Sequence, residues 1–106
     1  SKTLGIEYKL KDLVSELSKI QYAFIFGSIA KGKEYGSSDI DLMLIGEVDQ
    51  DLLIEKISKL QSELSREINY QIYTKAEVEK KLVERNEFFV NIFNEPIINL
   101  KGDLHR

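Results

Sequence analysis

The sequence contains no cysteine, no tryptophan, one proline and one histidine among its 106 residues. Without cysteine the chain cannot form disulfides, build thiolate metal sites or use a cysteine nucleophile. The absence of cysteine also fits a reducing compartment, so we expect a cytoplasmic protein. No apolar run approaches the roughly 20 residues that a membrane-spanning helix needs, and no signal-peptide pattern is present. We therefore expect no association with a membrane.

Positive charge is in slight deficit, because 15 Lys and Arg residues face 18 Asp and Glu residues and the formal net charge is −3. This balance disfavours binding of nucleic acid through bulk charge, so we expect no direct nucleic-acid binding by this domain. It suits a site that gathers carboxylates for a metal ion. The length fits one domain spanning residues 1–106. The first residue, Ser1, leaves open that this domain is excised from a longer chain.

Apolar residues that recur every three or four positions predict helices, and alternating or continuous short apolar runs predict strands. The expected elements are a helix over residues 5–19, a strand over 22–26, a loop over 27–38, a strand over 39–45, a helix capped by Asp49, a strand over 67–73, a helix that begins with the capping box of Thr74 and Glu77, a helix over 86–93 and a strand over 97–101. Pro96 favours an edge position for the last strand. This order predicts an α/β fold (α+β in stricter usage) with a mixed sheet and helices packed mainly on one face.

Two carboxylates and a glycine-rich loop form the most informative pattern. Asp39 and Asp41 lie two positions apart on a predicted strand, so both side chains point to one face, about 6–7 Å apart along the chain. Carboxylates this close repel each other unless a cation lies between them, and oxygen ligands suit Mg²⁺ or Mn²⁺. Upstream, Gly27 permits a close approach of the backbone to a ligand, and Ser28 offers a hydroxyl and an N–H. A phosphate-binding loop beside a metal site is typical of phosphoryl or nucleotidyl transfer.

The same loop carries two lysines and a possible short helix. If a helix starts within residues 29–33, its N-terminus favours an anion. Lys31 and Lys33 add positive charge in the loop. Their other interpretation is that of solvated loop charges, and the sequence leaves both interpretations open.

This pattern resembles a known family. The glycine-serine pair and the later D-x-D strand match the GS-x-A-x-G…SDIDL signature of minimal nucleotidyltransferase domains in the DNA polymerase beta superfamily. The matching residues are Gly27, Ser28, Ala30, Gly32, Ser38, Asp39, Ile40, Asp41 and Leu42. A Gly-Ser pair followed at this distance by a D-x-D strand is far more specific than a lone glycine motif. The resemblance covers most of the chain and is strongest over residues 22–45.

The resemblance implies a role for each matching residue. Asp39 and Asp41 would ligate Mg²⁺ (or Mn²⁺) and place the α-phosphate of a nucleoside triphosphate for attack by an acceptor hydroxyl, with pyrophosphate leaving. Both aspartates are therefore the catalytic and metal-binding candidates. Gly27 and Ser28 would hold the β- and γ-phosphates. The nucleotide-binding candidates of the loop are Gly27, Ser28, Lys31 and Ser38.

The sequence departs from the family at one position. Complete members carry a third carboxylate on the next strand, and the matching residue here is Asn69. An amide is a weaker metal ligand and cannot act as a base. Glu67 shares the face of Asn69 by strand alternation and is an alternative third carboxylate, although it lies about 6.6 Å further along the strand. The pattern therefore predicts Mg-nucleotide binding and leaves efficient turnover open.

Several functions stay open. The first is a nucleotidyltransferase whose acceptor is chosen by a helical partner protein, as in toxin–antitoxin pairs. The second is a catalytically weak nucleotide sensor in a transcriptional regulator, because the segments over residues 66–77 and 96–103 resemble the branch fused to winged-helix DNA-binding domains. A third is a scaffold that dimerises its host protein. Phe88, Phe89 and Phe93 are expected in the core or at an interface with a partner or second copy.

Overall fold

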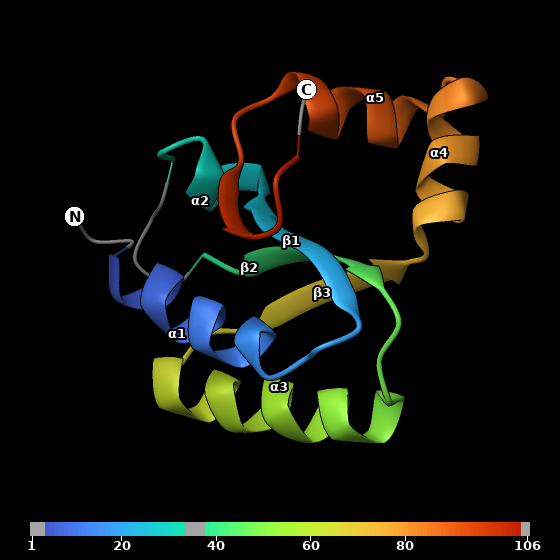
Figure 1. Cartoon of the computed structure of the whole chain (residues 1–106). Helices are drawn as coiled ribbons and strands as arrows, with labels where there is room; N and C mark the ends of the chain where they lie inside the picture. The colour runs from blue at the N-terminus through green and yellow to red at the C-terminus, as the bar shows by residue number, and fades with distance from the viewer. Residues whose placement is uncertain (1–3, 34–37, 105–106) are drawn as a thin grey trace.

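The computed structural model describes residues 4–33 and 38–104 (Figure 1). Its elements are α1 Leu4–Ser15, β1 Ile20–Phe26, α2 Gly27–Ala30, β2 Ile40–Gly46, α3 Gln50–Leu64, β3 Ile68–Tyr73, α4 Lys75–Val83, α5 Glu87–Asn94 and β4 Ile98–Lys101. The order is the predicted one, with α2 added at the start of the predicted loop. The first helix is shorter than predicted, and β1 begins two residues earlier. No helix in the described ranges is both long and apolar enough to cross a membrane.

The sheet is mixed, as the sequence predicts. Over the described residues its strand order is β3-β2-β1-β4. β2 runs parallel to β3 and antiparallel to β1, and β1 runs antiparallel to β4. The end of β1 therefore meets the starts of β2 and β3 at one end of the sheet. β4 follows Pro96 and lies at an edge, which confirms the edge prediction.

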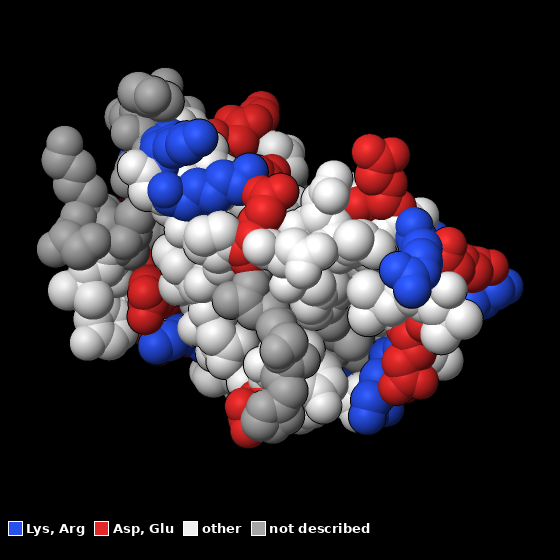
Figure 2. All heavy atoms as spheres, turned by 90° about the horizontal axis from the view of Figure 1, so that it is seen from above, with Lys and Arg blue, Asp and Glu red and all other residues white. Residues whose placement is uncertain are grey.

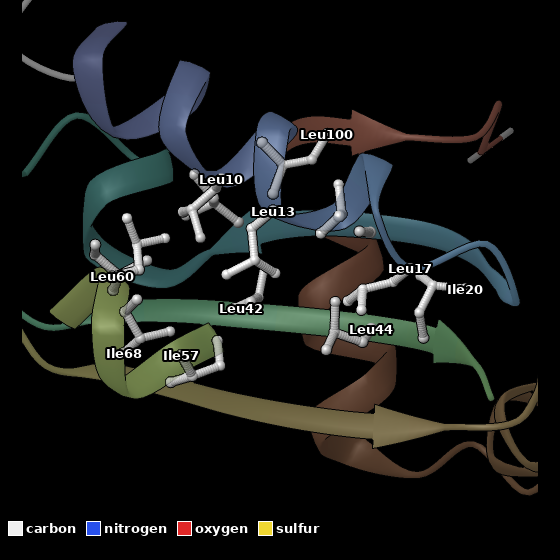
Figure 3. Close-up of a cluster of buried hydrophobic side chains, with 14 of the residues drawn as sticks. Leu10, Leu13, Leu17, Ile20, Leu42, Leu44, Ile57, Leu60, Ile68 and Leu100 are labelled. Atoms are coloured by element: carbon white, nitrogen blue, oxygen red, sulfur yellow. The ribbon is translucent and has the colours of Figure 1, made fainter. Parts of the chain in front are cut away.

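The two longer helices, α1 and α3, cover one face of the sheet with apolar side chains (Figure 3). Leu10 and Leu13 of α1 and Ile57 of α3 belong to one buried cluster with Leu42 and Leu44 of β2. Leu10, Leu42 and Leu44 have no exposed surface. This layer is the larger part of the core and is the one-sided packing that the sequence predicts.

A second buried cluster lies on the opposite face. Because neighbouring side chains of a strand point to opposite faces, Met43 turns away from the layer that holds Leu42. Met43 and Phe24 pack with Val78 of α4 and Phe89 of α5. The helices α4 and α5 thus cover part of the second face (Figure 1). The prediction of helices mainly on one face holds for α1 and α3 and did not include this second layer.

The end of α4 projects beyond this second layer. Leu82 is 37% exposed and Val83 is 83% exposed, although Val78 of the same helix is buried. The aromatic residues of α5 divide in the same way. Phe89 is buried, Phe93 is partly buried, and Phe88 is 40% exposed.

Side chains at the element ends fix the connections. Asp49 accepts hydrogen bonds from the backbone N–H groups of residues 51 and 52, and Thr74 forms the predicted capping box with Glu77. Gln61 ties the end of α3 to the start of β3. Its side-chain Oε1 accepts a hydrogen bond from the N–H of Ile68 at 2.8 Å, and its backbone carbonyl accepts one from the N–H of Arg66 at 3.3 Å.

Candidate functional site

Asp39 and Asp41 lie where β2 begins, on the face covered by α4 and α5. Asp41 is the second residue of β2 and is half-buried, whereas Asp39 precedes the strand and is exposed. Burial raises the pKa of Asp41, and the nearby charge of Asp39 raises it further, while a hydrogen bond from Asn69 acts in the opposite direction. The two carboxylates are therefore close enough to repel each other, as the D-x-D pattern predicts.

Gly27 is packed directly against Asp41. It follows the last residue of β1, Phe26, whose Cα partner across the sheet is Asp41. Gly27 has φ +75°, a conformation that other residues rarely adopt. A Cβ atom at this position would overlap Oδ2 of Asp41 and lie 3.2 Å from its Cγ. A side chain at this position would therefore displace the carboxylate of Asp41 as well as strain the loop backbone.

The loop after β1 is compact. α2 begins at Gly27 and not within residues 29–33, so the predicted position of a short helix is wrong by about two residues. The carbonyl of Gly27 accepts a hydrogen bond from the N–H of Lys31 at 3.1 Å, and the carbonyl of Ser28 accepts one from the N–H of Lys33 at 2.9 Å. These hydrogen bonds hold the loop in a compact helical turn. The half-buried Ser28 therefore stays at the same end of the sheet as Gly27.

The remaining loop candidates have partners outside the loop. Lys31 forms an ion pair with Glu95, which follows α5. Ser38 is half-buried, and its carbonyl accepts a hydrogen bond from Nη1 of Arg66 at 3.0 Å. Lys33 is exposed. Residues 34–37 of the motif lie outside the described ranges.

Asn69 lies beside the two aspartates on the neighbouring strand, β3. It is the Cα partner of Asp41 in the parallel pairing of β2 with β3. Its Nδ2 donates a hydrogen bond of 3.1 Å to Oδ2 of Asp39. The amide thus bridges toward both aspartates, where a third carboxylate would repel them.

The oxygen atoms at this position suit a hard divalent cation. Mg²⁺ in nucleotide sites is commonly held by one or two carboxylates together with substrate phosphates and water, and Asp39 and Asp41 supply two carboxylates. In residues 4–33 and 38–104, no group of three or more His, Cys, Asp or Glu side chains is close enough to hold a metal ion. Glu67 therefore does not complete a set of three with the two aspartates.

The sequence did not reveal every residue around the site. The sequence alone does not place Arg66 at the site, because its contact with Ser38 depends on the parallel pairing of β2 with β3. Glu95 was not singled out, because its ion pair joins segments 64 residues apart. The half-buried Phe26 was counted only as part of a buried strand.

Solved structures share this fold. A chain from a toxin–antitoxin complex with AMP-PNP superposes with a TM-score of 0.61 at 20% identity, over 92% of this chain and 73% of that chain. A chain from a mutant of the MntA-HpeT toxin–antitoxin superposes with a TM-score of 0.63 at 20% identity, over the same shares. At this identity the likeness concerns the fold.

Sequence comparison extends the likeness to a curated protein and to a family. MJ0604 of Methanocaldococcus jannaschii, which bears the provisional name of a protein adenylyltransferase, is 36% identical over 59 residues. The match covers 51% of this chain and 59% of that protein, less than two thirds of its length. A family model described as polymerase beta, nucleotidyltransferase, matches residues 8–97, which include the Gly27 loop, both aspartates and Asn69. The chain belongs to the polymerase beta nucleotidyltransferase family.

Proposed function

We propose that this nucleotidyltransferase domain binds a magnesium nucleoside triphosphate at the end of the sheet where β1, β2 and β3 meet. The observation that carries the proposal is the placement of Gly27 against Asp41, with Asp39 beside it and Asn69 in register on the next strand. Glycine at this point leaves room for the Asp41 carboxylate beside the loop. Two carboxylates this close need a cation, and phosphate oxygens are common partners of Mg²⁺ in nucleotide sites.

Each residue has a distinct role in the proposed complex. Asp39 and Asp41 hold Mg²⁺ (or Mn²⁺), which supplies charge neutralisation for the phosphates when it is bound. Gly27 and Ser28 face the β- and γ-phosphates through their backbone and hydroxyl groups. Lys31 and Ser38 flank the phosphates, and Lys31 adds positive charge near them while it stays paired with Glu95.

The reaction that this arrangement supports is nucleotidyl transfer to a hydroxyl acceptor. The hydroxyl oxygen forms a bond to the α-phosphorus while the bond to the bridging oxygen breaks, and pyrophosphate leaves. The hydroxyl proton passes to water, because the amide of Asn69 cannot accept it. We therefore expect transfer to be slow relative to family members with a third carboxylate at that position.

Calorimetric titration of MgATP and MgGTP into the whole chain tests the proposal. We expect magnesium-dependent binding in the unmodified protein and none in a double variant with Asp39→Asn and Asp41→Asn. Absence of binding up to millimolar nucleotide in the unmodified protein would overturn the proposal. A circular dichroism spectrum of the double variant serves as the control for folding.

A second candidate function is a nucleotide-sensing or partner-binding role with little turnover. Its support is Asn69, which bonds Asp39 in place of a third carboxylate. In this role the domain would belong to a winged-helix regulator, or act as the antitoxin-like partner of a helical toxin. The structural neighbours come from toxin–antitoxin complexes, one with AMP-PNP, which favours the helical partner.

Release of pyrophosphate separates the two candidates. With glycerol and water as the hydroxyl acceptors for the nucleotidyl group, nucleotide binding with pyrophosphate release supports the enzyme, and binding without release supports the sensor. Sedimentation of the protein with and without MgATP tests whether it forms a homodimer in either role. A domain spanning residues 1–106 that dimerises and binds no nucleotide would support the scaffold.

A further inference from the structure

A cavity of about 240 Å³ opens beside the candidate site. Gly27 belongs to its wall, so the cavity is continuous with the loop that packs against Asp41. The rest of the wall comes from the end of β1, from α5 and from the ion pair beside it: Phe26, Phe88, Asn91, Ile92, Lys31 and Glu95. The cavity thus lies on the α5 side of Gly27, whereas Asn69 lies on the β3 side of Asp41.

Two aromatic rings meet at this cavity. Phe26 is the cross-strand partner of Asp41, so its half-buried ring lies on the same face as that carboxylate. Phe88 contacts it edge to face, with ring centroids 5.9 Å apart. Phe88 is 40% exposed, although the adjacent Phe89 is buried in the core. A partly exposed ring beside a nucleotide site offers a surface on which a base can stack, and stacking of this kind tolerates any base.

The charges of the wall disfavour a second phosphate. Lys31 is paired with Glu95, so the cavity carries both signs and no net attraction for an anion. Seen from the side of α4 and α5, the charged side chains of the described residues gather toward the two ends of the molecule, and uncharged described residues lie between them (Figure 2). A neutral, planar group fits this environment better than a phosphate or a charged peptide does.

The amide of Asn91 gives the cavity a means to distinguish bases. Asn91 is exposed on α5, and no hydrogen bond engages its side chain within residues 4–33 and 38–104. An asparagine amide can donate to N7 and accept from the N6 amino group of adenine, whereas guanine presents an oxygen in place of that amino group.

We propose that this cavity is the nucleobase subsite, with stacking on Phe88 and a preference for adenine set by Asn91. The inference rests on the proposed function, because the base can lie here only if the phosphates lie at Gly27. It adds a specificity-determining residue and a substrate class, an adenine nucleoside triphosphate, to a site defined so far by phosphate and metal ligands.

Titration of three magnesium-loaded probes tests the inference: inorganic triphosphate, ATP and GTP. We expect the unmodified protein to bind ATP more tightly than triphosphate, and more tightly than GTP by about 5- to 150-fold. Phe88→Ala should weaken ATP and GTP binding by a similar factor and leave triphosphate binding unchanged. Asn91→Ala should remove most of the preference for ATP over GTP. Tyr8→Ala, which removes a ring that is 61% exposed on α1, is the matched control and should change none of these affinities.

The outcomes separate this inference from the proposed function. If triphosphate binds in a manner that requires Asp39 and Asp41 but ATP binds no more tightly, the base subsite is wrong and the phosphate site stands. If Phe88→Ala weakens triphosphate as much as ATP, or Asn91→Ala keeps the base preference, the subsite is also wrong. If none of the three probes binds, both proposals fail.

Discussion

The carboxylate of Asp41 fills the space that a side chain at position 27 would need. The carboxylate of Asp41 lies where the Cβ atom of any other residue at position 27 would be placed. The sequence signature pairs a glycine with an aspartate fourteen positions later, and the fold explains the pairing by direct contact between β1 and β2. The backbone of the loop and the carboxylate proposed to bind the metal therefore depend on each other for their positions.

Gly27→Ala should weaken both stability and nucleotide binding. The positive φ alone costs about 1–2 kcal/mol with a Cβ atom present. Gly32→Ala is the matched control, because Gly32 also has φ +73° but a Cβ atom there would have no neighbour within 4 Å. Chemical denaturation should show a loss for both variants, and calorimetry should show lost MgATP binding only for Gly27→Ala. Equal loss of binding in both variants would contradict the role of the Gly27–Asp41 contact.

The pH dependence of stability should report the raised pKa of Asp41. The folded chain binds this proton more tightly than the unfolded chain does, because burial and Asp39 raise the pKa above its ordinary value of 3.8. The free energy of unfolding therefore falls as the pH rises from 3.8 through the raised pKa. Without metal, Asp41→Asn should accordingly have a higher unfolding temperature than the unmodified protein at neutral pH, and this advantage should disappear below pH 3.8.

Added Mg²⁺ provides the counterpart of that measurement. It should raise the unfolding temperature of the unmodified protein at neutral pH and leave Asp41→Asn unchanged, because only ionised carboxylates bind the cation. Asp39→Asn should gain less stability than Asp41→Asn in metal-free buffer, since Asp39 is exposed. A metal-free Asp41→Asn variant that is less stable than the unmodified protein would show that the hydrogen bond from Asn69 outweighs burial.

Asn69→Asp should convert the site toward a three-carboxylate arrangement. The new carboxylate would replace a hydrogen bond to Asp39 with repulsion, so the metal-free protein should become less stable. With Mg²⁺ and ATP, pyrophosphate release should rise by about 100- to 10,000-fold, the range expected for a restored general base. Asn99→Asp, which alters an exposed amide on β4 that donates to Gly102, is the control and should leave release unchanged. An unchanged rate in Asn69→Asp would mean that Asn69 does not limit turnover.

Arg66 should act on the site through its backbone contact. Its guanidinium donates to the carbonyl of Ser38, directly before Asp39, and a hydrogen bond from a charged group contributes about 1.5–3 kcal/mol. Arg66→Ala should therefore lower stability and weaken Mg²⁺ binding. Lys101→Ala offers a close match, because Lys101 donates to the carbonyl of Leu17 at the same distance of 3.0 Å, in a part-buried position within the other layer. Titration with Mg²⁺ should detect a loss in Arg66→Ala only, and a similar loss in Lys101→Ala would assign the effect of Arg66 to stability.

The sequence predicted what local patterns determine. Alternation in β3, the capping box at Thr74 and the edge position after Pro96 all depend on neighbouring residues, and the structure confirms them. The layer formed by α4 and α5 was missed because Phe24 and Met43 belong to continuous apolar runs, in which no alternation reveals that both faces are covered.

The candidate site was predictable to the extent that its residues are close in sequence. Asp39 and Asp41 share one strand, so their common face followed from alternation. The partners of Lys31 and Ser38 did not follow, because Glu95 and Arg66 reach them only through the packing of α5 and the pairing of β3. Asn69 was identified by resemblance, and its register with Asp41 required the parallel pairing.

The hydrogen bond between Gln61 and Ile68 links α3 to the candidate site on the other side of the sheet. Parallel strands need a long crossover, and here the end of that crossover is fastened to the first residue of β3. A shift of β3 by a single position would turn Asn69 toward the layer of α1 and α3 and present Ile68 or Tyr70 beside Asp41. The length of α3 thus sets which residue of β3 lies beside Asp41. A change in the length of this helix would place a different residue there, with no substitution in β3 itself.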